Sequence, residues 1–265
     1  MIRMVTVEEI KTIGQSDRPL AARSPYYRVL RKVSPYFTKF FVESNISANQ
    51  ISSCSIMLGI IANFMFALGN HHLMLIGCVI YQFWYLFDIV DGEIARVTNM
   101  KTTGGKYLEK IHYILAECGF IASLGIGLSR ILNSDILISW GLTFAFFTSF
   151  LQAAARSRDV VLEQMRTGEE EKKETIITAQ IPFVKRFYKR ARLFFVVFTG
   201  YLIVTAIVII ELIFPVKFSF PIGLDYRLFG ETLTILSTYF FLYGFIWVVR
   251  AIVSSVTNFR RIMKD

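Results

Sequence analysis

The sequence predicts an all-α membrane protein, a six-transmembrane helical bundle preceded by an N-terminal interfacial amphipathic helix. Of the 265 residues, 54% are hydrophobic and only 18% are charged, and the mean hydropathy is +0.50. These values lie well outside the averages of soluble domains. Six apolar stretches are also long enough to cross a bilayer as helices. They cover residues 50–68, 72–90, 107–129, 136–155, 193–214 and 231–253.

The chain is expected to form one membrane domain between two cytoplasmic ends. Residues 1–45 are the N-terminal arm, residues 46–255 the six-helix domain, and residues 256–265 the tail. In the segment 24–47, aromatic and aliphatic residues recur together with basic ones at helical spacing. This pattern predicts an amphipathic helix in the membrane interface. A juxtamembrane helix that packs on the bundle is the alternative.

The lysines and arginines are concentrated on one side of the predicted membrane. They occur in the N-terminal arm, after the second span, and between the fourth and fifth spans, whereas the alternate loops hold only Arg130, Lys217 and Arg227. The positive-inside rule therefore places both termini in the cytoplasm. This asymmetry, together with attraction to anionic headgroups, accounts for the net charge of +9. We expect the membrane, and no nucleic acid, as a partner.

Charged residues gather where the second predicted span ends and the third begins, in LFDIVDGEIARVTNMKTTGGKYLEKIHY (86–113). Asp88 and Asp91 are one helical turn apart and share a face. Such a pair is half of a site for a hard cation such as Mg²⁺, which also keeps waters and phosphate oxygens as ligands. Because ionisable residues are costly at membrane depth, the cluster favours a functional site over structural ion pairs.

Small residues and an arginine follow the two aspartates. Gly92 and Ala95 leave room for a ligand to approach the backbone, and Arg96 can bind phosphate. On the next span, Glu109 and His112 share a face, so that a third carboxylate can face the first two.

His112 adds a titratable imidazole to this stretch. With an ordinary pKa of about 6.5, a histidine can accept a proton or bind a metal through a neutral nitrogen. A histidine that is only hydrogen-bonded within the bundle is the alternative. His71 and His72 fall in the short turn on the opposite side, where we expect them to be solvated.

The pattern Asp88-x2-Asp91-Gly92-x2-Ala95-Arg96-x8-Gly105-x3-Glu109 resembles the signature of the CDP-alcohol phosphotransferases, also called CDP-alcohol phosphatidyltransferases. That signature reads D-x2-D-G-x2-A-R-x8-G-x3-D-x3-D. The segment NISANQISSCSIMLG (45–59) is similar to the family's approach to its first span, although Ala48 stands where a proline is usual. Six spans, with the motif at the cytoplasmic ends of the second and third, also match the family. The resemblance covers most of the chain from about residue 26.

The resemblance implies an integral membrane transferase of phospholipid or glycolipid biosynthesis. Such an enzyme moves a phospho-alcohol group from a CDP-alcohol donor to the hydroxyl of a lipid or phosphorylated-alcohol acceptor and releases CMP. The resemblance also implies a homodimer, and it makes residues 46–255 the catalytic domain. We expect the protein in a prokaryotic plasma membrane, with its active site on the cytoplasmic face.

The resemblance also assigns roles to the motif residues by position. Three carboxylates would bind one or two Mg²⁺ or Mn²⁺ ions: Asp88, Asp91 and Glu109. The small residues and the arginine would line the cytidine diphosphate: Gly92, Ala95, Arg96 and Gly105.

Two positions depart from the signature. Glu109 replaces the third aspartate and keeps the charge, but its extra methylene moves the carboxylate. Tyr113 replaces the fourth aspartate, which is usually taken as the general base, and an ordinary tyrosine titrates only at about pH 10. His112 is therefore the predicted base, with Tyr113 as the alternative. A second function also stays open, that of a catalytically weak relative that binds nucleotide or lipid as a non-enzymatic partner protein.

Overall fold

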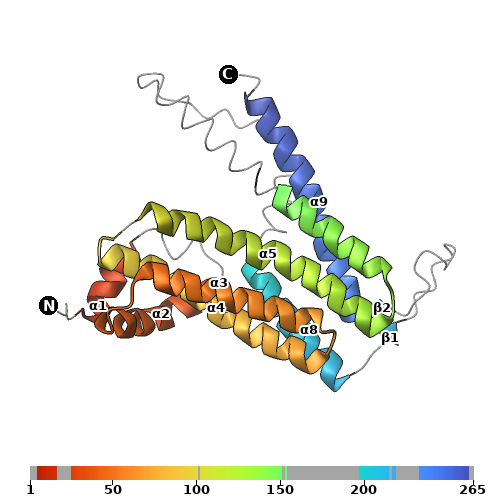
Figure 1. Ribbon diagram of the computed structural model, residues 1–265, viewed down its shortest axis with the longest axis horizontal. Coiled ribbons are helices and arrows are strands. Elements are labelled where there is room, and N and C mark those ends of the chain that lie inside the picture. The colour runs from red at the N-terminus through yellow and green to blue at the C-terminus, as the bar shows by residue number, and fades with distance from the viewer. Residues whose placement is uncertain are drawn as a thin grey trace.

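The computed structural model describes residues 5–16, 25–100, 102–150, 153, 197–214, 217–218 and 233–262, and this part of the chain is almost entirely helical (Figure 1). The helices are α1 (Val7–Glu9), the π-helical turn η1 (Ile10–Gly14), α2 (Pro25–Glu43), α3 (Ala48–Ala67), α4 (His71–Val97), α5 (Thr103–Leu132), an unlabelled helix (Ile136–Phe150), α8 (Val197–Ile213) and α9 (Ile235–Ile262). Two-residue strands, β1 (Lys217–Phe218) and β2 (Leu233–Thr234), pair antiparallel between α8 and α9. The predicted helical class is thus confirmed for these residues.

Three helical segments are long and apolar enough to cross a membrane. They are Ala48–Ala67, His71–Val97 and the Ile114–Leu132 part of α5. Shorter apolar helices, Ile136–Phe150, Ile203–Ile213 and Ile235–Ile246, fall within the other three predicted spans. The structure therefore supports an integral membrane protein with three candidate spans. The full six-span bundle stays a prediction, and the first residues of the predicted fifth span, 193–196, lie outside the described residues.

Side-chain caps define where α3, α4 and α5 begin. Ser47 forms a capping box with Gln50 at the start of α3, Asn70 accepts from two backbone amides at the start of α4, and Thr102 caps α5. Between the helices the chain turns at residues with positive φ: Asn45, Gly69, Asn99 and Asn133. Because the connections are short, α4 runs antiparallel to α3, and α5 runs antiparallel to α4. The start of α3, the end of α4 and the start of α5 therefore meet at one end of the bundle (Figure 1).

The core lies where α3 packs along both α4 and α5. Phe66, Tyr81 and Phe120 are fully buried there and contact one another, two of the pairs edge to face. Gly127 allows α3 and α5 to approach closely, since a Cβ at this position would lie 2.1 Å from the Phe66 carbonyl oxygen. Helices of membrane proteins commonly use small residues in this way.

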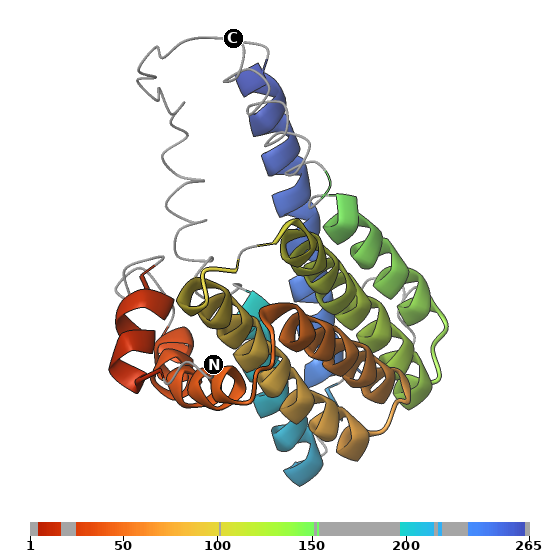
Figure 2. The same cartoon turned by 60° about the vertical axis from the view of Figure 1, so that its left-hand side comes forward.

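The N-terminal elements η1 and α2 lie against the motif-bearing end of α4, on the left of Figure 1 and again beside α4 in Figure 2, and α1 contacts η1 and α2. Helix α2 has two distinct faces. Its buried face carries Tyr27, Arg31, Ser34 and Thr38, and its exposed face carries Val29, Val33, Tyr36 and Phe40. The predicted helix is thus present, with an apolar face left uncovered by the rest of the described chain. Its location in the membrane interface stays a prediction.

Candidate active site

The last turns of α4 present the two motif aspartates at the end of the bundle that faces α2. Asp88 and Asp91 are three residues apart in one helix, so both carboxylates lie on one side of α4. Both are partly exposed, and 14% of the Asp88 side chain is accessible to solvent. Oxygen donors in this arrangement can reach a hard cation from solvent.

Helix α5 brings His112 against the first of these aspartates. The imidazole Nε2 lies 3.4 Å from Oδ1 of Asp88, and only 1% of the His112 side chain is exposed. Its ring stacks on the indole of Trp84, with ring centroids 4.5 Å apart and planes at 11°. Ser55 Oγ lies 2.9 Å from the other ring nitrogen, Nδ1. The imidazole is therefore held on three sides, with Nε2 directed toward the motif carboxylate.

Helix α3 contributes polar residues that sequence reasoning missed. Asn49, Ser52 and Ser55 recur every three residues, and each contacts a residue of the motif region. Ser52 Oγ donates a hydrogen bond to Oδ2 of Asp91. Asn49 Nδ2 lies 3.3 Å from the hydroxyl of Thr102, the residue that caps α5. A run of polar residues at helical spacing in an otherwise apolar span is the signal that could have identified them.

The two motif glycines make room for polar side chains of the chain itself. A Cβ on Gly92 would lie 3.2 Å from both terminal nitrogens of Arg96, so the guanidinium packs over this glycine. Arg96 Nε donates to the backbone carbonyl of Gly14 in η1. A Cβ on Gly105 would lie 3.0 Å from Oδ1 of Asn49. Gly92 and Gly105 therefore allow the Arg96 guanidinium and the Asn49 amide to approach closely, and Ala95, on the same helix as Gly92, is partly exposed.

The remaining predicted positions are placed by the backbone alone. Glu109 and Tyr113 belong to α5, on either side of His112 in sequence, but their side chains lie outside the described part of the structure. Among the side chains that are described, no three His, Cys, Asp or Glu residues gather closely enough to hold a metal ion. The two described carboxylates, which lie one turn apart on α4, are nevertheless groups that Mg²⁺ or Mn²⁺ accepts as ligands.

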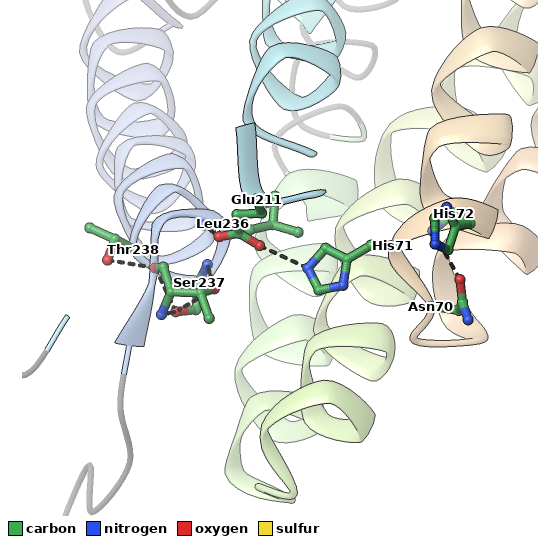
Figure 3. A network of polar contacts seen from close by, with 8 residues as sticks. Asn70, His71, His72, Glu211, Leu236, Ser237 and Thr238 are labelled. Atoms are coloured by element: carbon green, nitrogen blue, oxygen red, sulfur yellow. Dashed lines mark hydrogen bonds and ion pairs between the residues drawn. The ribbon is translucent and has the colours of Figure 1, made fainter. Parts of the chain in front are cut away.

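At the opposite end of α4, the environment of His71 differs from the one expected from the sequence. This side chain is not simply solvated: its Nε2 lies 2.9 Å from Oε2 of Glu211 on α8 (Figure 3). Glu211 also accepts a hydrogen bond of 2.7 Å from the backbone amide of Leu236 on α9. His72 is exposed, as expected. The expectation for His71 was wrong because a histidine in a turn shows no sequence signal for a partner 140 residues away.

Comparison with protein families shows the family of this chain. The profile of the CDP-alcohol phosphatidyltransferase family matches residues 45–220, which include α3, α4, α5 and the whole motif. The chain belongs to this family. Comparison with curated proteins gives no significant match. Membership of the CDP-alcohol phosphatidyltransferase family supports a membrane phosphotransferase role in lipid synthesis, for which the family implies a CDP-alcohol donor and an alcohol acceptor.

Proposed function

We propose that this CDP-alcohol phosphatidyltransferase is an active, divalent-metal-dependent enzyme. It moves a phospho-alcohol group from a CDP-alcohol to the hydroxyl of a lipid or phosphorylated-alcohol acceptor and releases CMP. The observation that carries the proposal is the 3.4 Å separation between His112 Nε2 and Asp88 Oδ1. This short distance supports His112 as a proton acceptor beside the motif carboxylates. Such an acceptor is needed because Tyr113 stands where the signature has its fourth aspartate.

In this proposal, some motif residues bind the metal ions and others bind the cytidine diphosphate. Asp88, Asp91 and Glu109 would hold one or two Mg²⁺ or Mn²⁺ ions, which when bound neutralise the charge of the diphosphate. Gly92, Ala95, Arg96 and Gly105 would line the cytidine diphosphate. In this group Arg96 supplies a guanidinium, which suits phosphate oxygens.

Ser55 directs the imidazole for proton transfer. The Ser55 hydroxyl donates to the carbonyl of Ser52 at 2.8 Å, which leaves an Oγ lone pair to accept from Nδ1–H of His112. In this tautomer Nε2 carries the lone pair that accepts a proton, and Asp88, whose Oδ1 lies 3.4 Å from Nε2, would stabilise the imidazolium that forms. The acceptor oxygen attacks the phosphorus that bears the alcohol, and its proton passes to Nε2. The bond from that phosphorus to the bridging oxygen of CMP then breaks.

One observation favours the second candidate, a relative that binds nucleotide or lipid without turnover. The His112 side chain is only 1% exposed, which limits its contact with an acceptor. A protein that used this histidine only to hold Asp88 would keep nucleotide binding and lose transfer. CMP release separates the two candidates, because only the enzyme forms CMP.

The experiment measures CMP release by the purified full-length chain in lipid nanodiscs. CDP-diacylglycerol and other CDP-alcohols are offered with Mg²⁺ and a panel of lipid and phosphorylated-alcohol acceptors. We expect Asp91→Asn to abolish release and His112→Ala to lower it by about 10²–10⁴-fold, the usual contribution of a general base. The matched controls are Asp135→Asn and His72→Ala, since both residues are exposed and lie at the other end of the bundle.

The outcomes separate the proposals. Full activity of His112→Ala would overturn the base assignment and leave Tyr113 as the alternative. Retention of a cytidine nucleotide without CMP release from any donor would favour the non-enzymatic relative. We further propose that the protein forms a homodimer in a prokaryotic plasma membrane, with the site and both termini cytoplasmic.

A further inference from the structure

A buried carboxylate lies inside the motif, at a position that the signature leaves open. Glu93 follows Gly92 near the end of α4, and this residue is completely buried (0% exposed). A buried carboxylate is costly unless hydrogen-bond donors satisfy its oxygens. The metal and nucleotide roles proposed above do not use this group, so its function needs a separate explanation.

Three donors reach Glu93, and all come from the N-terminal elements. Ser34 Oγ on α2 donates to Oε1 at 2.6 Å, and Thr38 Oγ1, one turn further along, donates to Oε2 at 2.7 Å. Gln15, directly after η1, donates from Nε2 to Oε1 at 2.9 Å. These donors precede residue 45, where the match to the family begins. The contact therefore joins a segment outside the family profile to the family's motif.

Gln15 is held from a second side by α2. Its Nε2 also donates to the carbonyl of Arg31 at 2.8 Å, and Arg31 Nη1 donates to the carbonyl of Gln15 at 3.2 Å. Arg31 is itself buried, and its guanidinium donates to the Tyr27 hydroxyl at 2.9 and 2.7 Å. The backbone at residue 15 is thus fixed between α2 and α4.

The preceding residue, Gly14, contacts the motif arginine. Its carbonyl accepts the hydrogen bond from Arg96 Nε, and the guanidinium of Arg96 lies over Gly92. The chain passes close to α4 here, since a Cβ on Gly14 would lie 3.3 Å from Val97 Cγ2 and 3.4 Å from Glu93 Cβ. Glu93 therefore connects to Arg96 through one short stretch of backbone.

We infer that Glu93 is a positioning residue, which fastens Gly14 and Gln15 to α4 so that the Gly14 carbonyl orients Arg96 for the diphosphate of a CDP-alcohol. The inference rests on the proposed function, in which Arg96 binds the diphosphate. It assigns to the N-terminal segment a role in nucleotide binding, in addition to any contact with the membrane. A side chain that only stabilised the fold would weaken every property of the protein without a link to Arg96.

The test is a double-mutant cycle on CDP affinity. Isothermal titration calorimetry measures CDP binding, with Mg²⁺ present, to the full-length chain in nanodiscs. We expect Glu93→Gln to raise the Kd about tenfold, because a charged acceptor of three hydrogen bonds becomes neutral. Arg96→Lys lacks the Nε donor, so in that background Glu93→Gln should cause no further loss. Glu43→Gln, which changes a partly exposed carboxylate of α2, is the matched control and should leave the Kd unchanged.

Each outcome bears on the inference. An unchanged Kd for Glu93→Gln, or an equal loss in both backgrounds, would overturn it while CDP binding by the wild type upholds the proposed site. If the wild type binds no CDP with Mg²⁺, the proposed function and this inference both fail. If Glu93→Gln does not fold, Gln15→Ala takes its place in the cycle and should show a smaller loss with the same dependence on Arg96.

Discussion

Ser52 on α3 contacts Asp91 on α4, one of the carboxylates proposed to bind the metal ion. Its Oγ donates to Oδ2 of Asp91 and so fixes the rotamer of that carboxylate. Loss of a group that orients a ligand typically lowers metal affinity 10- to 100-fold. We therefore expect Ser52→Ala to raise, by about that factor, the Mg²⁺ concentration that gives half-maximal CMP release. A titration of activity against Mg²⁺ measures this concentration directly.

Ser53 provides the control for this prediction. It is adjacent in sequence and exposed, and its hydroxyl donates to the carbonyl of Asn49 within α3. Ser53→Ala should leave the Mg²⁺ requirement unchanged. The role given to Ser52 would be wrong if Ser52→Ala and Ser53→Ala responded alike.

For individual residues, the sequence predicts contacts within one helix better than contacts between helices. The spacing of Asp88 and Asp91 follows from helix geometry alone, and the prediction that His112 could point into the site is consistent with its contact to Asp88. Ser52 and Ser55 were missed because serine is also a common packing residue in membrane helices. Which serines face the site depends on how α3 packs against α4 and α5, which spacing within α3 does not reveal.

Close approach between α3 and α5 depends on Gly127. A methyl group there would lie 2.1 Å from the carbonyl oxygen of Phe66, and this atom belongs to a helix backbone that cannot move independently. We expect Gly127→Ala to push the two helices apart and lower the free energy of unfolding by roughly 1–3 kcal/mol, the usual cost of overpacking. Thermal unfolding in detergent, followed by circular dichroism, measures the loss.

Gly104 is the matched position on the same helix. A Cβ there would have only the Thr102 hydroxyl nearby, at 3.9 Å, so Gly104→Ala should leave the unfolding temperature nearly unchanged. Equal unfolding temperatures for the two variants would show that α3 and α5 adapt to the added methyl group.

The ends of the elements were harder to predict than their existence. Hydropathy placed the second span at 72–90, whereas α4 continues to Val97 and carries the motif beyond the apolar stretch. Likewise α5 begins at Thr103 and not at 107. Hydropathy records where apolar residues stop, but a helix stops where a cap or a left-handed residue such as Asn99 ends its hydrogen bonding.

For the whole molecule, composition was sufficient to predict a helical membrane protein but not how distant segments meet. The N-terminal arm was expected to contact the membrane, and the structure adds that residues 14 and 15 contact the motif about 80 residues later in the chain. Gln15 and Glu93 are ordinary polar residues in sequence, so neither signals the other. Such contacts follow from tertiary packing, which also joins α4 to α8, and α8 to α9, at the opposite end of the bundle.

That opposite end depends on Glu211, whose side chain is only 4% exposed. Its carboxylate accepts from Leu236 N of α9 and pairs with His71 at the start of α4, so one residue of α8 links three helices (Figure 3). Removing a partner leaves a buried acceptor unsatisfied, which costs about 1–3 kcal/mol. We expect His71→Ala to lower the unfolding temperature in detergent and to preserve CMP release at low temperature, because the motif lies at the other end of α4.

His72→Ala, at an exposed neighbour, should change neither property. Since the His71 contact requires the Glu211 carboxylate, His71→Ala should cost less in a Glu211→Gln background, and full additivity of the two losses would show that the pair contributes no stability of its own.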